Sequence, residues 1–335
     1  MVLADLTTLR LGGPARTLVT ARSEAEIVAA VRGAQPPVLV LAGGSNLVVA
    51  DDGFDGTVVH VASRGVQRDG SRLTAAAGEP WDYLVALTVR EGLAGIECLS
   101  GIPGSTGATP IQNVGAYGQE VAETITGVRV FDREADAVLD LAPGECGFGY
   151  RASRFKYHDR WVVLSVTFEL TRTTDSRPVR YAELAGALGV QLGETAPLAD
   201  VRAAVLALRR RKGMVVSPDD PDSVSAGSFF TNPIMALQDF EALQERAAPE
   251  RPPAWPEADG RVKTSAAWLI QRAGFERGYG TGPAGISSKH ALALVNRGGA
   301  RTADLVALAR EIRDGVRAAF GVDLHPEPVL VGVSL

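Results

Sequence analysis

Two glycine-rich segments are the strongest candidates for chemistry in this sequence. They read LAGGSNLVV at 41–49 and GIPGSTGATPIQNVGAYG at 101–118. Closely spaced glycines let backbone N–H groups approach an anion, and the neighbouring Ser, Thr and Asn side chains add neutral donors. The two segments could therefore hold the pyrophosphate of a dinucleotide. Neither has the Lys of a P-loop or the GxGxxG spacing of a Rossmann fingerprint, and the alternative for each is a structural turn.

Three further segments carry one reactive side chain each. FGYRASRFK (148–156) contains Arg151, whose guanidinium can pair bidentately with a carboxylate. SAGSFFTNP (225–233) sets Ser228 after a glycine and before two phenylalanines, without the GxSxG pattern of a hydrolase. LHPEPVLVG (324–332) sets Glu327 between two prolines, which stiffen the backbone and remove two donors. From pattern alone, each segment is more typical of structure: a solvated Arg loop, a strand-turn with core phenylalanines, and an exposed Glu at an edge strand.

The elements that must position these segments alternate along the chain and predict a mixed α+β class. Ser23 and Glu26 form a capping box, Thr302 is expected to cap the last helix, and Gly321 to end it. The basic run 209–212 ends a helix, where cations also satisfy the helix dipole. The expected helices are 24–33, 81–91, 198–211, 264–273 and 302–320, and the expected strands are 38–42, 57–62, 73–78, 126–131, 161–170, 291–296 and 328–333.

Two stretches without regular periodicity complete this outline. Residues 95–118 are too rich in Gly and small polar side chains for a packed element, and loops of that length inside a domain are usually functional. The Pro/Asp-rich stretch 215–224 is the expected domain boundary. We expect His290 and Trp268 to pack rather than to react.

Composition limits the function classes further. With 335 residues, 46 % hydrophobic and 22 % charged, the chain is long enough for two or three globular domains and is not disordered. A net charge of −5 disfavours nucleic acid and anionic membranes as partners, so an anionic ligand must meet a local basic patch. Two unpaired cysteines and four scattered histidines exclude a disulfide framework and disfavour a metal site, and they fit a reducing cytosol.

The N-terminal region indicates no targeting segment. Asp5 and Arg10 interrupt any apolar core of a signal peptide, and no run reaches the roughly 18 apolar residues of a membrane span. We therefore expect a cytoplasmic protein.

Taken in order, these motifs resemble one family, UDP-N-acetylenolpyruvoylglucosamine reductase, also called UDP-N-acetylmuramate dehydrogenase, in its longer type I branch. The resemblance runs from TTLRLGGPA (7–15) to the last strand. It implies an α+β chain with a vanillyl-alcohol-oxidase/PCMH-type FAD-binding fold of two subdomains and a C-terminal α+β substrate-binding domain. The implied boundaries are 1–60 joined by 328–335, then 61–212, then 213–327.

The resemblance also implies the activity: NADPH-dependent, FAD-mediated reduction of UDP-N-acetylglucosamine enolpyruvate to UDP-N-acetylmuramate in peptidoglycan precursor synthesis. FAD should be bound non-covalently, because the flavin segments hold no His and Cys98 is the only thiol nearby. The expected partners are the sugar nucleotide and NADPH, with no nucleic acid, no membrane and no second copy of the chain. NADPH has no binding signature of its own, so it and the substrate should take turns at the flavin.

Residue roles follow from the same resemblance. Arg151, Ser228 and Glu327 match the catalytic positions, and Tyr181, Lys212 and Asn232 match positions that contact the substrate. If Lys212 is out of register, Arg209, Arg210 or Arg211 would take its role. The implied FAD-binding residues are Ala42, Gly43, Gly44, Ser45, Asn46, Leu47, Gly101, Gly104, Ser105, Thr106, Gly107, Ala108, Gln112, Asn113 and Gly115.

Two rival functions stay open from the sequence. An oxidase of the same FAD fold, acting on a hydroxy acid or an alcohol, would share the first half of the chain but would not need SAGSFFTNP or Glu327. A non-catalytic nucleotide-binding or scaffold protein would be colourless when purified, whereas a flavoprotein is yellow.

Overall fold

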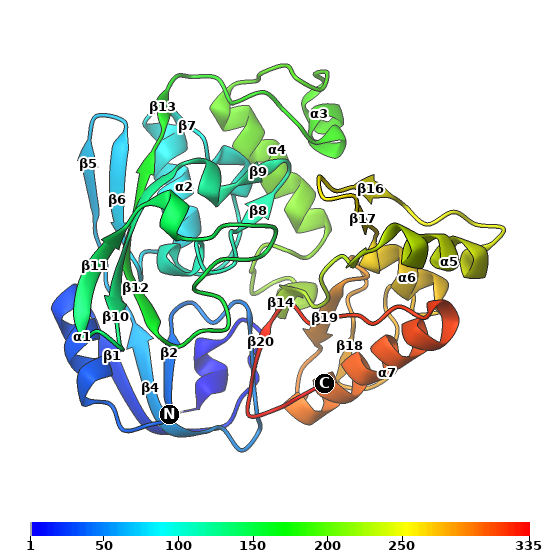
Figure 1. Ribbon diagram of the computed structural model, residues 1–335, viewed down its shortest axis with the longest axis horizontal. Helices are drawn as coiled ribbons and strands as arrows, with labels where there is room; N and C mark the ends of the chain where they lie inside the picture. The colour runs from blue at the N-terminus through cyan, green and yellow to red at the C-terminus, as the bar shows by residue number, and fades with distance from the viewer. Residues whose placement is uncertain (1) are drawn as a thin grey trace. The chain divides into compact units, whose positions relative to one another are not determined.

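The computed structural model describes residues 2–335, and its contacts divide into two units (Figure 1). The central unit comprises Ala15–Gly43 and Asp55–Arg211, and the C-terminal unit comprises Lys212–Leu335 with Gly44–Phe54 and the residues up to Pro14. This division begins the C-terminal unit at Lys212 and assigns two N-terminal segments to it. The finer three-part division stays a prediction.

The central unit is built on a five-stranded antiparallel sheet of order β11-β10-β12-β6-β5. A smaller sheet of order β1-β4-β2 contains a parallel β2–β4 pair. Its helices are α1 (Glu24–Gly33), α2 (Trp81–Arg90), α3 (Ala182–Leu188) and α4 (Leu198–Arg211). Its strands are β1 (Ala15–Ala21), β2 (Val38–Leu41), β4 (Phe54–Val61), β5 (Val66–Asp69), β6 (Arg72–Ala76), β7 (Leu93–Ala94), β8 (Gly115–Ala116), β9 (Gln119–Glu120), β10 (Ile125–Asp132), β11 (Ala137–Leu141), β12 (Trp161–Glu169) and β13 (Thr171–Arg172).

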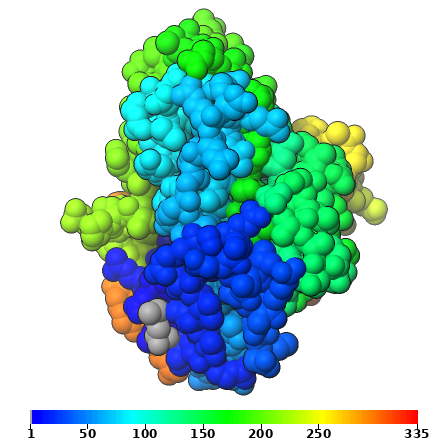
Figure 2. Space-filling view, turned by 90° about the vertical axis from the view of Figure 1, so that its left-hand side faces the viewer, coloured from blue at the N-terminus to red at the C-terminus, as the bar shows by residue number. Residues whose placement is uncertain are grey.

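One hydrophobic core joins α1 and α2 to the sheets of this unit, whereas α3 and α4 pack in a separate, smaller cluster. Ile27 of α1 and Trp81 of α2 are fully buried with Phe168 of β12, and the Trp81 and Phe168 rings lie 5.9 Å apart. At the surface, ion pairs link α1 to β10 and to the turn after it: Arg129 pairs with Glu24, and Arg32 with Asp136. Blue and green residues lie side by side on the face of the molecule drawn in Figure 2. Helices α1 and α2 are therefore held to the large sheet by a shared core and, for α1, by surface ion pairs.

The C-terminal unit contains three small sheets and a long helix. The sheets have the orders β14-β19-β18 and β15-β17-β16, and β20 pairs in parallel with β3. Its helices are α5 (Leu237–Ala247), α6 (Ala266–Arg272) and α7 (Thr302–Phe320). Its strands are β3 (Leu47–Val49), β14 (Ser225–Ser228), β15 (Ile234–Met235), β16 (Trp255–Pro256), β17 (Val262–Lys263), β18 (Ala284–Ile286), β19 (Ala293–Asn296) and β20 (Val329–Val331).

The predicted cap of α1 is confirmed, whereas the residue predicted to cap α7 is wrong. Ser23 Oγ accepts from Glu26 N at 3.2 Å, as the capping box requires. In α7 the cap position is Arg301, and Thr302 is the first helical residue, with its hydroxyl donating to a backbone carbonyl of β3. The Asp51 carboxylate accepts from Thr302 N at 2.7 Å and so supplies the cap from a distant loop.

Among residues 2–335, no helix is both long and apolar enough to cross a bilayer.

Candidate active site

The two glycine-rich segments meet within the central unit. A Cβ atom added at Gly43 would lie 2.7 Å from Gly104 Cα and 3.3 Å from Ser105 N. Gly104 also has a φ of +113° and Gly101 a φ of +71°, both in the region that favours glycine. Gly43 therefore serves a close approach of two backbones, one from each segment, and Gly101 and Gly104 allow a left-handed backbone.

Gly107 packs closely against a residue outside the glycine-rich segment. A Cβ atom there would lie 2.5 Å from Ala77 Cβ and 2.8 Å from Ala77 Cα. Gly107 N donates to Ala77 O at 2.8 Å, and Thr106 N and Oγ1 both donate to Glu79 O. The backbone at 106–107 is thus fixed against residues 77–79, and the glycine is required by packing.

Asn113 links the segment 101–118, which the sequence predicts to bind the cofactor, to the loop that carries Arg151. It is buried, and its Nδ2 donates to Glu120 Oε2 at 2.7 Å and to Gly149 O at 3.1 Å. Arg151 Nη2 in turn donates to Gly115 O at 2.8 Å. The central unit therefore brings Arg151 against the segment 101–118, on which its guanidinium is anchored.

Arg151 itself has a constrained backbone. Its φ of +51° lies in the left-handed region, which non-glycine residues seldom adopt. Lys156 Nζ donates to its carbonyl oxygen at 2.9 Å, and its guanidinium lies 5.3 Å from the Tyr150 ring. These contacts hold a half-buried cation in one place, as recognition of a carboxylate requires.

Tyr181 lies before α3 in the same unit, with 43 % of its surface exposed. Its ring meets the Tyr117 ring edge-on, at 5.4 Å and 85°. Burial raises the pKa of Tyr117 to about 12, against an opposing effect of the nearby Arg209 guanidinium. Arg209 is 8 % exposed, so one cation of the predicted basic run is part of the interior beside this tyrosine pair.

In the C-terminal unit, Ser228 and Glu327 lie on adjacent segments. Ser228 ends β14, and the next residue, Phe229, accepts a hydrogen bond from Glu327 N at 2.8 Å. Phe230 and Pro326 form a further antiparallel bridge. Both phenylalanines are 1 % exposed, so the predicted aromatic wall is core that fixes β14 in place. Ser228 and Glu327 themselves are half-buried.

Asn232 and Lys212 also belong to this unit. Asn232 Oδ1 accepts from Ala266 N at 3.0 Å at the start of α6, which orients the amide so that Nδ2 is its remaining donor group. Lys212 precedes Gly213, where a Cβ atom would lie 2.8 Å from Asp222 Cβ. The long connector after Lys212 therefore folds back on itself as a loop, and the role of Lys212 stays a prediction.

Asp222 holds that loop in place. Its carboxylate accepts from Ser288 N at 2.8 Å and from Ser288 Oγ at 2.7 Å. Burial opposes ionisation, but hydrogen bonds from Ser287 and Ser288 outweigh it and lower the pKa of Asp222. Sequence reasoning missed this residue, and also Tyr117, because neither an acidic connector nor one Tyr in a glycine-rich loop is a distinctive signal.

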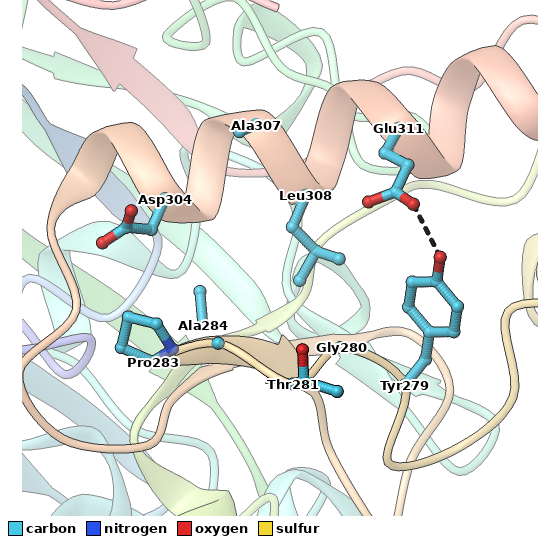
Figure 3. Close-up of a pocket in the computed structure, with 10 residues that line it drawn as sticks. Tyr279, Gly280, Thr281, Pro283, Ala284, Asp304, Ala307, Leu308 and Glu311 are labelled. Carbon is cyan, nitrogen blue, oxygen red and sulfur yellow. Dashed lines mark hydrogen bonds between the residues drawn. The ribbon is translucent and has the colours of Figure 1, made fainter.

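A groove of about 590 Å³ lies between α7 and the loop before β18, in the C-terminal unit (Figure 3). Its two acidic side chains already have partners: Glu311 accepts from the Tyr279 hydroxyl at 2.6 Å, and Asp304 accepts from Arg301 N at 2.8 Å. These contacts belong to the fold of α7, and we assign no ligand to the groove.

Cys98 is unsuited to bonding a flavin. It is 5 % exposed, and burial together with the Glu97 carboxylate raises the pKa of its thiol far above the usual range. A thiol that does not ionise is a poor nucleophile. This supports the prediction of a non-covalent cofactor.

Comparisons with known proteins identify the family. Residues 15–139 match the model of an FAD binding domain, and residues 219–331 match that of the UDP-N-acetylenolpyruvoylglucosamine reductase C-terminal domain. The reductase of that name from Thermobifida fusca is 59 % identical, over 99 % of this chain and 97 % of its own. The one from Salinispora arenicola is 60 % identical, over 99 % and 95 %.

A solved structure agrees as well. The crystal structure of UDP-N-acetylenolpyruvylglucosamine reductase from Thermus caldophilus matches with a TM-score of 0.70 and 28 % identity, over 99 % of this chain and 97 % of that one. The chain is thus an FAD-dependent oxidoreductase with the PCMH-type FAD-binding fold, and the predicted fold class is confirmed. It belongs to the UDP-N-acetylenolpyruvoylglucosamine reductase family.

Proposed function

We propose that Arg151, Ser228 and Glu327 carry out the reaction of this family in this chain: reduction of UDP-N-acetylglucosamine enolpyruvate to UDP-N-acetylmuramate, with NADPH as the hydride donor. The observation that most supports the proposal is the hydrogen bond between Glu327 N and Phe229 O. This bond joins the segment that carries the Ser228 hydroxyl to the segment that carries the Glu327 carboxyl group, almost 100 positions further along the chain. Neither segment alone is unusual.

FAD fits the residues proposed to hold it. They are neutral side chains and glycines, and Gly43, Gly101 and Gly104 have close backbone neighbours or left-handed backbones that a side chain would disturb. Of the residues proposed to hold FAD, Ala42, Gly43 and those in the segment 101–115 belong to the central unit, and residues 44–47 belong to the C-terminal unit. When bound and reduced, the flavin supplies the hydride for the terminal carbon of the enolpyruvyl group.

The three side chains would stabilise the negative charge that hydride addition creates and supply the proton that completes the product. Hydride addition puts negative charge on the adjacent carbon and its carboxylate, and Arg151 binds that carboxylate and stabilises the charge as a fixed cation. The Ser228 hydroxyl donates the proton to the carbon, because a carbanionic centre is a strong enough base to take it. Glu327 orients the enol or shares a proton with it. Tyr181, Lys212 and Asn232 bind the sugar nucleotide and its diphosphate.

We further propose that the chain works as a monomer in the cytoplasm, where NADPH and UDP-sugars are available. NADPH and the enolpyruvyl nucleotide would take turns at the flavin.

The direct test is anaerobic spectroscopy of the purified flavoprotein. NADPH should bleach the flavin absorbance, and the enolpyruvyl sugar nucleotide should then restore it with formation of one equivalent of UDP-N-acetylmuramate. Reoxidation by oxygen but not by the enolpyruvyl nucleotide would favour an oxidase of the same fold. A purified protein without flavin, and unable to take it up, would contradict the proposal altogether.

A further inference from the structure

We propose that Asn46 is a positioning residue for Glu327, an inference that rests on the catalytic role proposed above for Glu327. Asn46 Nδ2 donates to Glu327 O at 3.3 Å. Asn46 O accepts from Val329 N at 3.0 Å, on the other side of Pro328. Asn46 therefore bonds to the backbone of the catalytic segment twice, once through its side chain and once through its main chain.

The backbone of Glu327 is held from two sides. Its N–H donates to Phe229 O at 2.8 Å, beside Ser228, and its carbonyl accepts from Asn46. The flanking residues, Pro326 and Pro328, have no N–H, so Glu327 has the only backbone donor in this tripeptide. With both of its polar backbone groups bonded to other segments, Glu327 has its Cα fixed relative to Ser228 and to the 44–47 loop.

The sheet register supports the same link. β20 begins at Val329 and pairs in parallel with β3, with Val329 opposite Leu47. The pairing therefore starts one residue after Asn46 and two residues after Glu327. The Asn46 side chain extends this pairing by one further bond, past Pro328, to the carbonyl of the catalytic residue itself.

This arrangement has a chemical consequence. A carboxyl group that orients an enol must keep its position within a fraction of an ångström, since a displacement of about 1 Å can cost about 100-fold in rate. Asn46 lies in the loop predicted to bind FAD, so one residue connects the cofactor loop to the group that acts on the substrate. Its amide acts on Glu327 through the backbone, and not on the reacting atoms.

The experiment compares Asn46→Ala, Asn46→Asp and Glu327→Gln with the wild type in two half-reactions, with rates expressed per bound flavin. Flavin reduction by NADPH should be slowed less than reoxidation in each variant. Reoxidation by the enolpyruvyl nucleotide should slow by about 3- to 10-fold in Asn46→Ala, the effect of one lost neutral hydrogen bond. Asn46→Asp should be at least as slow at pH 8, because its ionised carboxylate only accepts hydrogen bonds and cannot donate to Glu327 O.

Thr231→Val is the matched control. The Thr231 hydroxyl donates to His325 O at 3.4 Å, two residues before Glu327, and its loss leaves both bonds to Glu327 in place. Reoxidation should stay within twofold of wild type.

The outcomes separate the two proposals. Normal reoxidation in Glu327→Gln would overturn the catalytic role of Glu327. Slow reoxidation in Glu327→Gln with normal reoxidation in Asn46→Ala would overturn the inference alone. Equal losses of flavin reduction and of reoxidation in Asn46→Ala would make Asn46 a residue that binds the cofactor only and would also overturn the inference. Reoxidation at the wild-type rate in Asn46→Asp at pH 8 would overturn it as well.

Discussion

Replacing Gly107 with Ala should destabilise the central unit without excluding the cofactor. The new methyl group would lie 2.5 Å from Ala77 Cβ and 2.8 Å from Ala77 Cα. The second of these atoms is backbone and cannot rotate away, so the segment must shift. Overpacking of this kind typically costs about 1–3 kcal/mol. For a unit of this size each kcal/mol lowers the thermal midpoint by about 2–4 °C, which gives a decrease of roughly 2–12 °C.

The assay is thermal unfolding of the holoenzyme by circular dichroism, with flavin content measured on the folded protein. Ala77→Gly combined with Gly107→Ala should recover part of the loss, because it removes the methyl group of residue 77 but leaves the backbone of that residue in the way. Gly186→Ala is the control: this helical glycine has nothing within 4 Å of an added Cβ, so Ala should be neutral or stabilise by about 0.5–1 kcal/mol. An unchanged midpoint in Gly107→Ala, or folded Gly107→Ala that takes up no FAD, would refute this reasoning.

Three further predictions concern charge and reactivity. The Arg160 guanidinium holds the pKa of Asp132 at about 2, below its unfolded value near ~4, so this carboxylate stabilises the fold above pH ~4 and loses the effect as the pH falls towards 2. In Asp132→Asn the thermal midpoint should depend less steeply on pH in that range than it does in the wild type. Equal slopes in the two proteins would contradict the assignment. Because burial raises the pKa of both the Cys98 and Cys146 thiols, neither should react with iodoacetamide at pH 8 unless the protein is unfolded. Lys212→Ala should raise the KM for the sugar nucleotide by roughly 10- to 150-fold, from loss of one charge-assisted hydrogen bond, with a smaller effect on kcat; an unchanged KM would move this role to a neighbouring arginine.

The sequence predicts those elements whose signals are local. The amphipathic pattern of 198–211 gives both ends of α4 correctly, and the Ser23 capping box gives the start of α1. The cap of α7 was missed because Asp51, some 250 positions away in the chain, supplies it. Propensity carries no information about such a partner.

The candidate site shows the same limit. The glycine-rich segments predict a ligand loop, but they do not reveal that Gly43 packs on Gly104 or that Gly107 packs on Ala77. The proximity of Ser228 and Glu327 follows from tertiary pairing, and only a resemblance to a family could indicate it in advance. The role of Asp222 in closing the connector has no local signal, because an Asp in a Pro/Asp-rich stretch is usually solvated.

Single-turnover kinetics of Ser228→Ala test the central claim most directly. If Ser228 donates the proton that completes the product, NADPH should reduce the flavin of this variant at close to the wild-type rate. Reoxidation by the enolpyruvyl nucleotide should slow by ~10²–10⁴-fold, the range for loss of a general acid. Equal slowing of both half-reactions, or reoxidation within twofold of wild type, would contradict the account.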